Sequence, residues 1–176
     1  MLSSRSRSQD APFVGPRWWV AGVYLAVALL AQTSFLHFLT FRGAEASPVL
    51  IAVVWYAIAS DVRRAALFGL IAGLCEDILS TGSGGGWTIA TTLTAILAST
   101  ASSGFFADSL PLVSAFVVLA TLLRNAIFWV VMAAQGYPAG LGIIHFHKTL
   151  WQALLNGLLV SIIMLVSRIL ENRKLR

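Results

Sequence analysis

Long apolar runs, separated by short polar or glycine-rich segments, dominate the chain. As a helix, a run of about 20 apolar residues is long enough to cross a bilayer core of about 30 Å. The transmembrane domain is expected to cover residues 18–170, between a disordered cytoplasmic tail at 1–17 and a basic cytoplasmic tail at 171–176. The pattern predicts an all-α polytopic membrane protein, a six-transmembrane-helix bundle with spans at residues 18–39, 49–60, 64–79, 87–103, 112–134 and 149–170.

The second apolar run is shorter than the others. Pro48, a residue suited to the first turn of a helix, precedes it. The run itself, at 49–60, has only 12 residues, which is short for a crossing. Three structures are compatible with it: the helix extends backwards, the bilayer thins locally, or the segment packs as a partly buried helix. The charged turn at 61–64 makes the second and third runs an antiparallel hairpin.

Composition narrows the class of protein. Of the 176 residues, 58% are hydrophobic and 11% are charged, and the mean hydropathy is +0.83. A soluble domain of this size could not cover so much apolar surface, so we expect an integral membrane protein. A cleaved signal peptide is the alternative for the first run, which follows a basic segment and contains Ala26-Val27-Ala28. The run continues to Leu39, however, and is long enough to be retained as a span.

Topology explains the net charge of +5 better than nucleic-acid binding, because the basic residues lie in tails and at segment ends. Six crossings place both termini on one side. If that side is the cytoplasm, it holds nine arginines and lysines, whereas the outer side holds Arg42 and Lys148. This asymmetry predicts cytoplasmic termini and places His145 and His147 outside. The nine residues are Arg5, Arg7, Arg17, Arg63, Arg64, Arg168, Arg173, Lys174 and Arg176.

Small residues recur every four positions in the third run. Ala65, Gly69, Gly73 and Asp77 would share one ridge of a helix. Such small residues allow the backbones of transmembrane helices to approach closely. The ridge is therefore predicted to be a packing face. A carboxylate at membrane depth needs a partner inside the bundle, so Asp77 is a candidate for more than packing.

Polar residues fall at matching depths in several spans. Gln32, Asp77 and Arg124 each lie 13 to 15 residues beyond the inner edge of an outward-running span. Gln152 and Asn156 reach a similar depth from the outer side. The sequence thus predicts a polar layer in the outer half of the bundle. Within it we expect Arg124 to pair with Asp77, or otherwise with Glu76, because an isolated charge at this depth costs about 2.5 to 3.5 kcal/mol.

The chain offers little that resembles a reaction centre. The glycine-rich turn at 80–86 is not followed by the Lys-Ser/Thr of a phosphate loop. Neither a His-Glu-x-x-His nor a Gly-x-Ser-x-Gly motif occurs, and Cys75 is the sole cysteine. His37, His145 and His147 are scattered. We therefore expect no enzyme activity, no cofactor and no metal site.

Two patches of the sequence resemble the MreD family of bacterial rod-shape-determining membrane proteins. One patch lies near the end of the printed sequence: Trp151, then Asn156-Gly157-Leu158 and a basic tail from Arg168, which together are similar to the family's last span. The chain departs from the family in having Ser47 where a basic residue commonly precedes the proline, in having Glu76 beside Asp77, and in its longer glycine run. The other patch lies earlier in the sequence and comprises Pro48 with the run to Tyr56, a basic turn, Gly69, Gly73, Asp77, Leu79-Ser80 and Gly84.

The resemblance implies a component of the machinery that elongates the lateral cell wall, located in the bacterial cytoplasmic membrane. Such proteins are six-helix scaffolds related in fold to the substrate-binding subunits of energy-coupling-factor transporters. The resemblance implies a single-span MreC-like partner and, through it, wall synthases and an actin-like filament. A substrate-binding subunit of a small-molecule, vitamin-type transporter is the alternative, since the polar layer could form a binding site.

Overall fold

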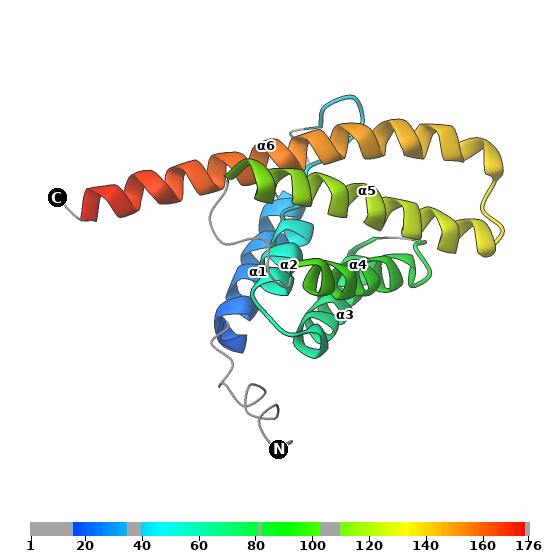
Figure 1. Ribbon diagram of the computed structural model, residues 1–176. Coiled ribbons are helices and arrows are strands. Elements are labelled where there is room, and N and C mark those ends of the chain that lie inside the picture. The colour runs from blue at the N-terminus through cyan, green and yellow to red at the C-terminus, as the bar shows by residue number, and fades with distance from the viewer. Residues whose placement is uncertain (1–15, 35–39, 81, 103–109, 175–176) are drawn as a thin grey trace, which may run out of the picture.

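The computed structural model describes residues 16–34, 40–80, 82–102 and 110–174, and these segments are helical apart from short turns (Figure 1). Within them the extended structure is limited to one isolated antiparallel bridge between Phe41 and Ala44. The all-helical prediction is confirmed. The helices are α1 (Trp18–Ser34), α2 (Pro48–Ile58), α3 (Val62–Leu79), α4 (Gly86–Ser102), α5 (Leu110–Ala134) and α6 (Gly142–Lys174), with the 3-10 turn η2 (Ala139–Leu141) ahead of α6.

The short helix α2 forms the centre of the molecule. It contacts α1, α3, α4, α5 and α6, and seven of its 11 residues are buried. At about 1.5 Å per residue α2 is about 16 Å long, half the thickness of a bilayer core. The helix does not extend backwards beyond Pro48, and it packs as a buried helix. Pro48 occupies the first turn of α2, as expected.

The small ridge of α3 packs against α4. A Cβ atom added to Gly69 would lie 2.7 Å from the Ala95 Cβ atom, and one added to Gly73 would lie 2.6 Å from the Thr88 Cα atom. Ala65 is also buried. The predicted packing face is therefore confirmed, and the absence of side chains at the two glycines allows the backbones of α3 and α4 to approach closely.

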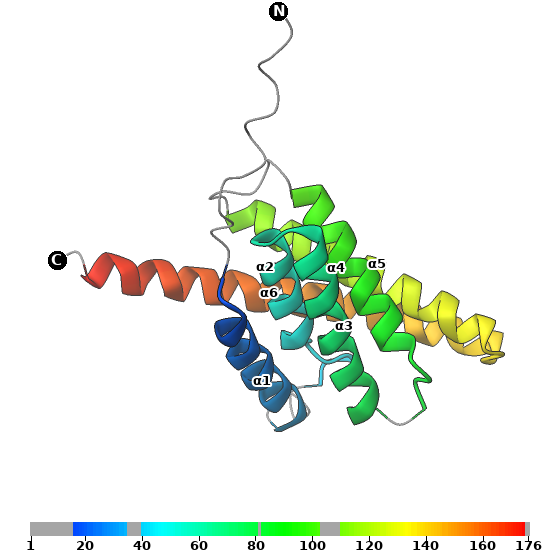
Figure 2. The same cartoon turned by 90° about the horizontal axis from the view of Figure 1, so that it is seen from below.

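Helices α5 and α6 lie side by side in both views and join through the turn that contains η2 (Figures 1 and 2). The segment between the last two predicted spans, residues 135–148, was expected to be a loop; this is wrong from Gly142 onward, because α6 begins there and carries His145 and His147. At its other end α6 continues through Lys174, past the predicted end of the last span. The cause is the same at both ends: polar residues flank an uninterrupted helical segment without breaking it.

Within the described segments, two helices are long and apolar enough to cross a membrane by length and composition: Pro111–Ala134 and Ala139–Leu170. Helices α1 and α2 are apolar but shorter. Helix α1 packs mainly against α2, through Ala21, Leu25 and Ala28. Its remaining surface is rich in exposed apolar side chains, Trp19 and Leu30 among them.

Candidate functional site

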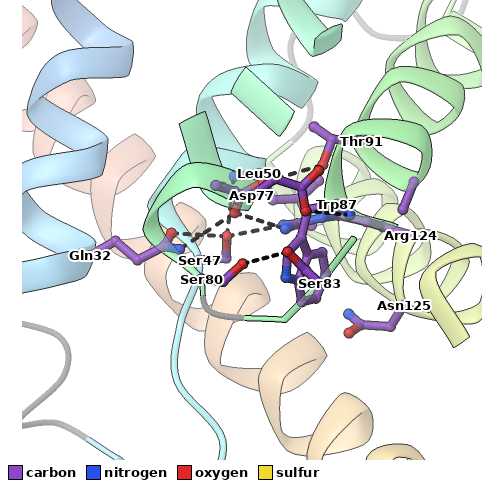
Figure 3. Close-up of polar contacts among 12 residues, drawn as sticks. Gln32, Ser47, Leu50, Asp77, Ser80, Ser83, Trp87, Thr91, Arg124 and Asn125 are labelled. Carbon is purple, nitrogen blue, oxygen red and sulfur yellow. Dashed lines mark hydrogen bonds and ion pairs between the residues drawn. The ribbon is translucent and has the colours of Figure 1, made fainter. Parts of the chain in front are cut away.

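Ser47 connects helices α1, α2, α5 and α6 at the amino end of α2. As the N-cap residue, its hydroxyl accepts a hydrogen bond from the Leu50 amide at 3.3 Å. The same hydroxyl accepts from Arg124 Nη1 and donates to Gln32 Oε1, both at 3.1 Å. Figure 3 shows Gln32 and Arg124 reaching Ser47 from opposite sides. The Ser47 backbone amide donates to Asn156 Oδ1 at 2.7 Å.

An ion pair joins Glu76 on α3 to Arg124 on α5. With Ser47, Gln32 and Asn156, these two residues form a group that we call the polar cluster. Arg124 Nη2 lies 2.7 Å from Glu76 Oε1, and the two side chains are 3% and 5% exposed, respectively. Glu76 also accepts hydrogen bonds from Gln32 and Thr91. The guanidinium carbon lies 4.5 Å from the centroid of the Trp87 ring, a cation–π contact. The primary expectation, a pair between Arg124 and Asp77, is wrong, and the alternative with Glu76 is confirmed.

Asp77 points away from the cluster and binds the start of α4. Its carboxylate accepts hydrogen bonds from the Trp87 amide at 3.1 Å and the Thr88 amide at 2.8 Å, and from the Thr88 hydroxyl. Successive helix residues are rotated by about 100°, so adjacent acids face different neighbours. The amino end of α4 carries partial positive charge, which makes it a suitable partner for an anion. Asp77 is thus a capping residue in this structure.

The glycine-rich turn brings α4 back onto the end of α3. Gly82, Gly84 and Gly85 all have positive φ angles, of 88°, 52° and 85°. A Cβ atom at Gly84 would lie 2.8 Å from Gln135 Oε1, and the side-chain Nε2 of Gln135 donates to the Gly84 carbonyl at 3.2 Å. The turn therefore rests on the end of α5.

The remaining members of the predicted polar layer join α5 to α6. Asn156 donates to the Thr121 hydroxyl at 3.0 Å, and Asn125 donates to Gln152 Oε1 at 2.8 Å. Gln152 in turn donates to the Glu45 carbonyl at 3.0 Å. The depth comparison thus identified residues that meet, with Glu76 in place of Asp77.

Gly157 and His145 occupy other parts of the interface between α5 and α6. A Cβ atom at Gly157 would meet a Val118 methyl group at 2.8 Å. The ring of His145 stacks on Phe128 and Trp129, with centroid distances of 5.6 and 5.5 Å. His145 is therefore part of an aromatic stack at the α5–α6 end.

Four contributors to the site were missed at the sequence level: Ser47 as a connecting residue, Thr91, Trp87 and Thr121. Ser47 carried a usable signal, because serine directly before an N1 proline is a common helix start. The threonines and Trp87 offered none, since their roles depend on how α4 and α5 pack.

A cavity of about 450 Å³ adjoins the cluster, and we name it the Glu76 cavity. Its charged lining residues are Glu45, Glu76 and Arg124. Among the described residues no group of three or more His, Cys, Asp or Glu side chains could hold a metal ion. The other lining residues are Leu29, Gln32, Thr33, Ala46, Ser47, Leu79, Ser80, Trp87 and Gln152.

Comparison of the chain with protein-family models, curated proteins and solved structures finds no match.

Proposed function

We propose that the chain is a non-enzymatic integral-membrane scaffold of the bacterial cell-wall elongation machinery, similar to MreD, that binds a MreC-like bitopic partner. In this proposal the protein is a multi-pass component of the cytoplasmic membrane with both termini inside. Wall synthases and an actin-like filament are reached through the partner.

The observation that carries the proposal is the internal pairing of the buried polar cluster. Glu76 and Arg124 bind each other, and Ser47 and Asn156 use their polar atoms on residues of other helices. A buried charge without a partner is costly, whereas a paired one can fix the relative positions of helices. Such a paired cluster is better suited to a rigid platform for a partner than to a reaction centre that rearranges.

The surface supports a membrane location. Large apolar side chains are exposed on several helices, including Leu30 at 65%, Ile78 at 82% and Ile143 at 70%. Soluble monomers rarely expose so much apolar surface, but lipid would cover it. The nine-to-two distribution of basic residues supports inward termini.

Partner capture in the native host tests the scaffold. A tagged chain, crosslinked in intact cells and purified in mild detergent, is expected to retain a bitopic MreC-like protein, identified by mass spectrometry. Depletion of the chain should convert rods into wide or round cells. A matched control is Asp61→Asn, which changes an exposed acid at the start of α3 that pairs with Arg64, three residues on; this variant should restore both partner capture and rod shape.

A substrate-binding subunit of a small-molecule transporter is the second candidate, favoured by the Glu76 cavity. Capture of an ATPase pair with a coupling subunit, together with normal cell shape on depletion, would replace the scaffold by this candidate. Capture of neither set of partners with unchanged cell shape would reject the scaffold as well.

A further inference from the structure

The segment before α2 forms a tight turn that packs on α6 (Figure 1). Phe41 and Ala44 exchange two backbone hydrogen bonds, of 2.9 and 3.0 Å. The two residues between them, Arg42 and Gly43, both have positive φ angles, as in the two-residue turns that join β-hairpins. The Phe41 ring meets the Trp151 ring of α6 edge to face, with the centroids 5.1 Å apart. The turn is therefore anchored on α6.

Two exposed basic side chains meet at this turn, and we name them the Arg42–Lys148 pair. The Arg42 guanidinium carbon lies 4.7 Å from the centroid of the Trp151 ring, a cation–π contact. A Cβ atom on Gly43 would lie 3.3 Å from the Lys148 Cε atom, so the Lys148 ammonium is one bond away from an atom in contact with the turn. The two basic residues expected on the outer side of the membrane are thus brought together by the fold.

The charge of this pair is not balanced by a neighbouring acid. Within the described segments, neither Arg42 nor Lys148 forms an ion pair. Glu45 is close in sequence, but its side chain lines the Glu76 cavity and already has an interaction of its own. Adjacent like charges repel each other, and an anion that contacts both removes this repulsion. The pair therefore favours an anionic ligand.

An exposed apolar face of α6 continues from Trp151 toward the carboxyl end of the helix. Leu154, Leu158, Ile162 and Leu165 follow Trp151 at spacings of three, four, four and three residues, so all five lie on one side of α6. The four aliphatic side chains are 58%, 60%, 49% and 54% exposed. At about 1.5 Å per residue this face is about 21 Å long, which exceeds half of a bilayer core of about 30 Å. It can therefore contact an acyl chain through the depth of one leaflet.

We propose that the Arg42–Lys148 pair binds the phosphate of an anionic phospholipid whose acyl chains lie along this face of α6. A guanidinium presents parallel N–H donors to a phosphate, and the lysine adds a second positive charge. The same two cations repel the ammonium of a zwitterionic head group, which favours a lipid with net negative charge. A free phosphate ester carries the same charged group but leaves the apolar face uncovered. The proposal rests on the membrane location in the proposed function and not on any protein partner.

Native mass spectrometry of the full chain in detergent micelles, mixed with equal amounts of phosphatidylglycerol and phosphatidylcholine, tests the site. We expect phosphatidylglycerol to be retained preferentially. Arg42→Gln and Lys148→Gln should each reduce its retention about fivefold, the change expected when one basic residue near an anionic lipid is lost. Arg42→Lys keeps the charge and should retain more of this lipid than Arg42→Gln. The matched control, Arg63→Gln, removes an exposed positive charge at the start of α3 and should behave as the wild type does.

A second variant and a soluble probe separate the lipid from its head group. Leu158→Gln places a polar group on the exposed face of α6 and should reduce phosphatidylglycerol retention while the basic pair is intact; unchanged retention would overturn the placement of the acyl chains. Thermal stabilisation by glycerol 3-phosphate that is lost in Arg42→Gln, without lipid retention, would replace the lipid by a free phosphate ester. Equal retention of both lipids, unchanged retention in Arg42→Gln and Lys148→Gln, or an equal loss in Arg63→Gln would overturn the proposal.

The same variants separate this site from the proposed function. Loss of partner capture in Arg42→Gln with unchanged lipid retention would overturn the lipid and assign the pair to an acidic segment of a protein partner. Partner capture by the wild type without lipid selectivity would reject this site and leave the scaffold intact. Recovery of the chain from the soluble fraction of cells would refute the membrane location on which both proposals rest.

Discussion

Replacing Glu76 by glutamine isolates the energetic value of the buried ion pair. Arg124 would remain 3% exposed, with its charge unbalanced. Removing one partner of a buried pair costs about 3 to 5 kcal/mol. The amide oxygen of glutamine can still accept one hydrogen bond, worth about 1 kcal/mol. We therefore expect Glu76→Gln to lower the free energy of unfolding by about 3 kcal/mol, toward the small end of that range.

A double-mutant cycle separates the pair from general damage. Arg124→Gln alone leaves Glu76 buried and unpaired, so its cost should be similar. The double variant removes both charges, and we expect it to recover about 2 kcal/mol relative to the sum of the single losses. The neighbouring acid is the matched control: Asp77→Asn weakens the cap of α4 and should cost about 1 kcal/mol. Its loss should add to that of Arg124→Gln without coupling.

The assay is equilibrium unfolding of the purified chain in detergent micelles by increasing mole fraction of sodium dodecyl sulfate, followed by far-UV circular dichroism. Losses for Glu76 and Arg124 that add within about 0.5 kcal/mol would refute the pair as a source of stability. Coupling between Arg124 and Asp77 larger than that with Glu76 would refute the assignment of partners.

Further predictions concern the helix contact, the polar cluster and the orientation. Gly73→Leu should lower the free energy of unfolding by about 3 kcal/mol in the same assay, because backbone atoms of α4 leave no room for a side chain, whereas the volume-conserving Leu70→Ile should cost about 1 kcal/mol or less; equal losses would mean that α4 does not restrict Gly73. Asn156→Leu leaves the Ser47 amide unpaired and should lower the free energy of unfolding by about 1 to 3 kcal/mol. A variant as stable as the wild type would contradict this prediction. A membrane-impermeant thiol reagent should label Ala139→Cys, at an exposed position in the turn between α5 and α6, but not Ser4→Cys in intact spheroplasts, and the reverse pattern would invert the topology.

Much of the helical framework could be predicted because it depends on local signals. Apolar runs marked the helices, Pro48 marked the start of α2, and the glycine spacing marked the face of α3. The start of α6 could not be placed correctly, since Gly142, His145 and Lys148 resemble a loop in composition. They are helical because the long apolar helix that follows them extends back to Gly142. The amino-acid composition of the residues that flank a helix predicts their structure less well than their position next to a stable helix, which can extend through them.

The site was predictable in depth but not in direction. Counting residues along each span placed Gln32, Arg124 and an acid of α3 at one level, and they do meet. Whether Glu76 or Asp77 faced inward depended on the rotation of α3 about its axis. That rotation is fixed by the close contact of Gly69 and Gly73 with α4 and by the return of α4 through the glycine turn, both of which are tertiary features.

The buried position of α2 has a consequence for the order in which the chain assembles. With 11 residues, α2 is too short to span a bilayer alone, so in the proposed membrane location it would enter together with a neighbouring helix. The amide of its N-cap residue, Ser47, donates to Asn156, which lies 109 residues later in the chain. During synthesis, this end of α2 therefore lacks its acceptor until the last helix emerges. A ribosome-bound chain that ends before α6 therefore holds an incomplete centre, and the synthesis of α6 completes it.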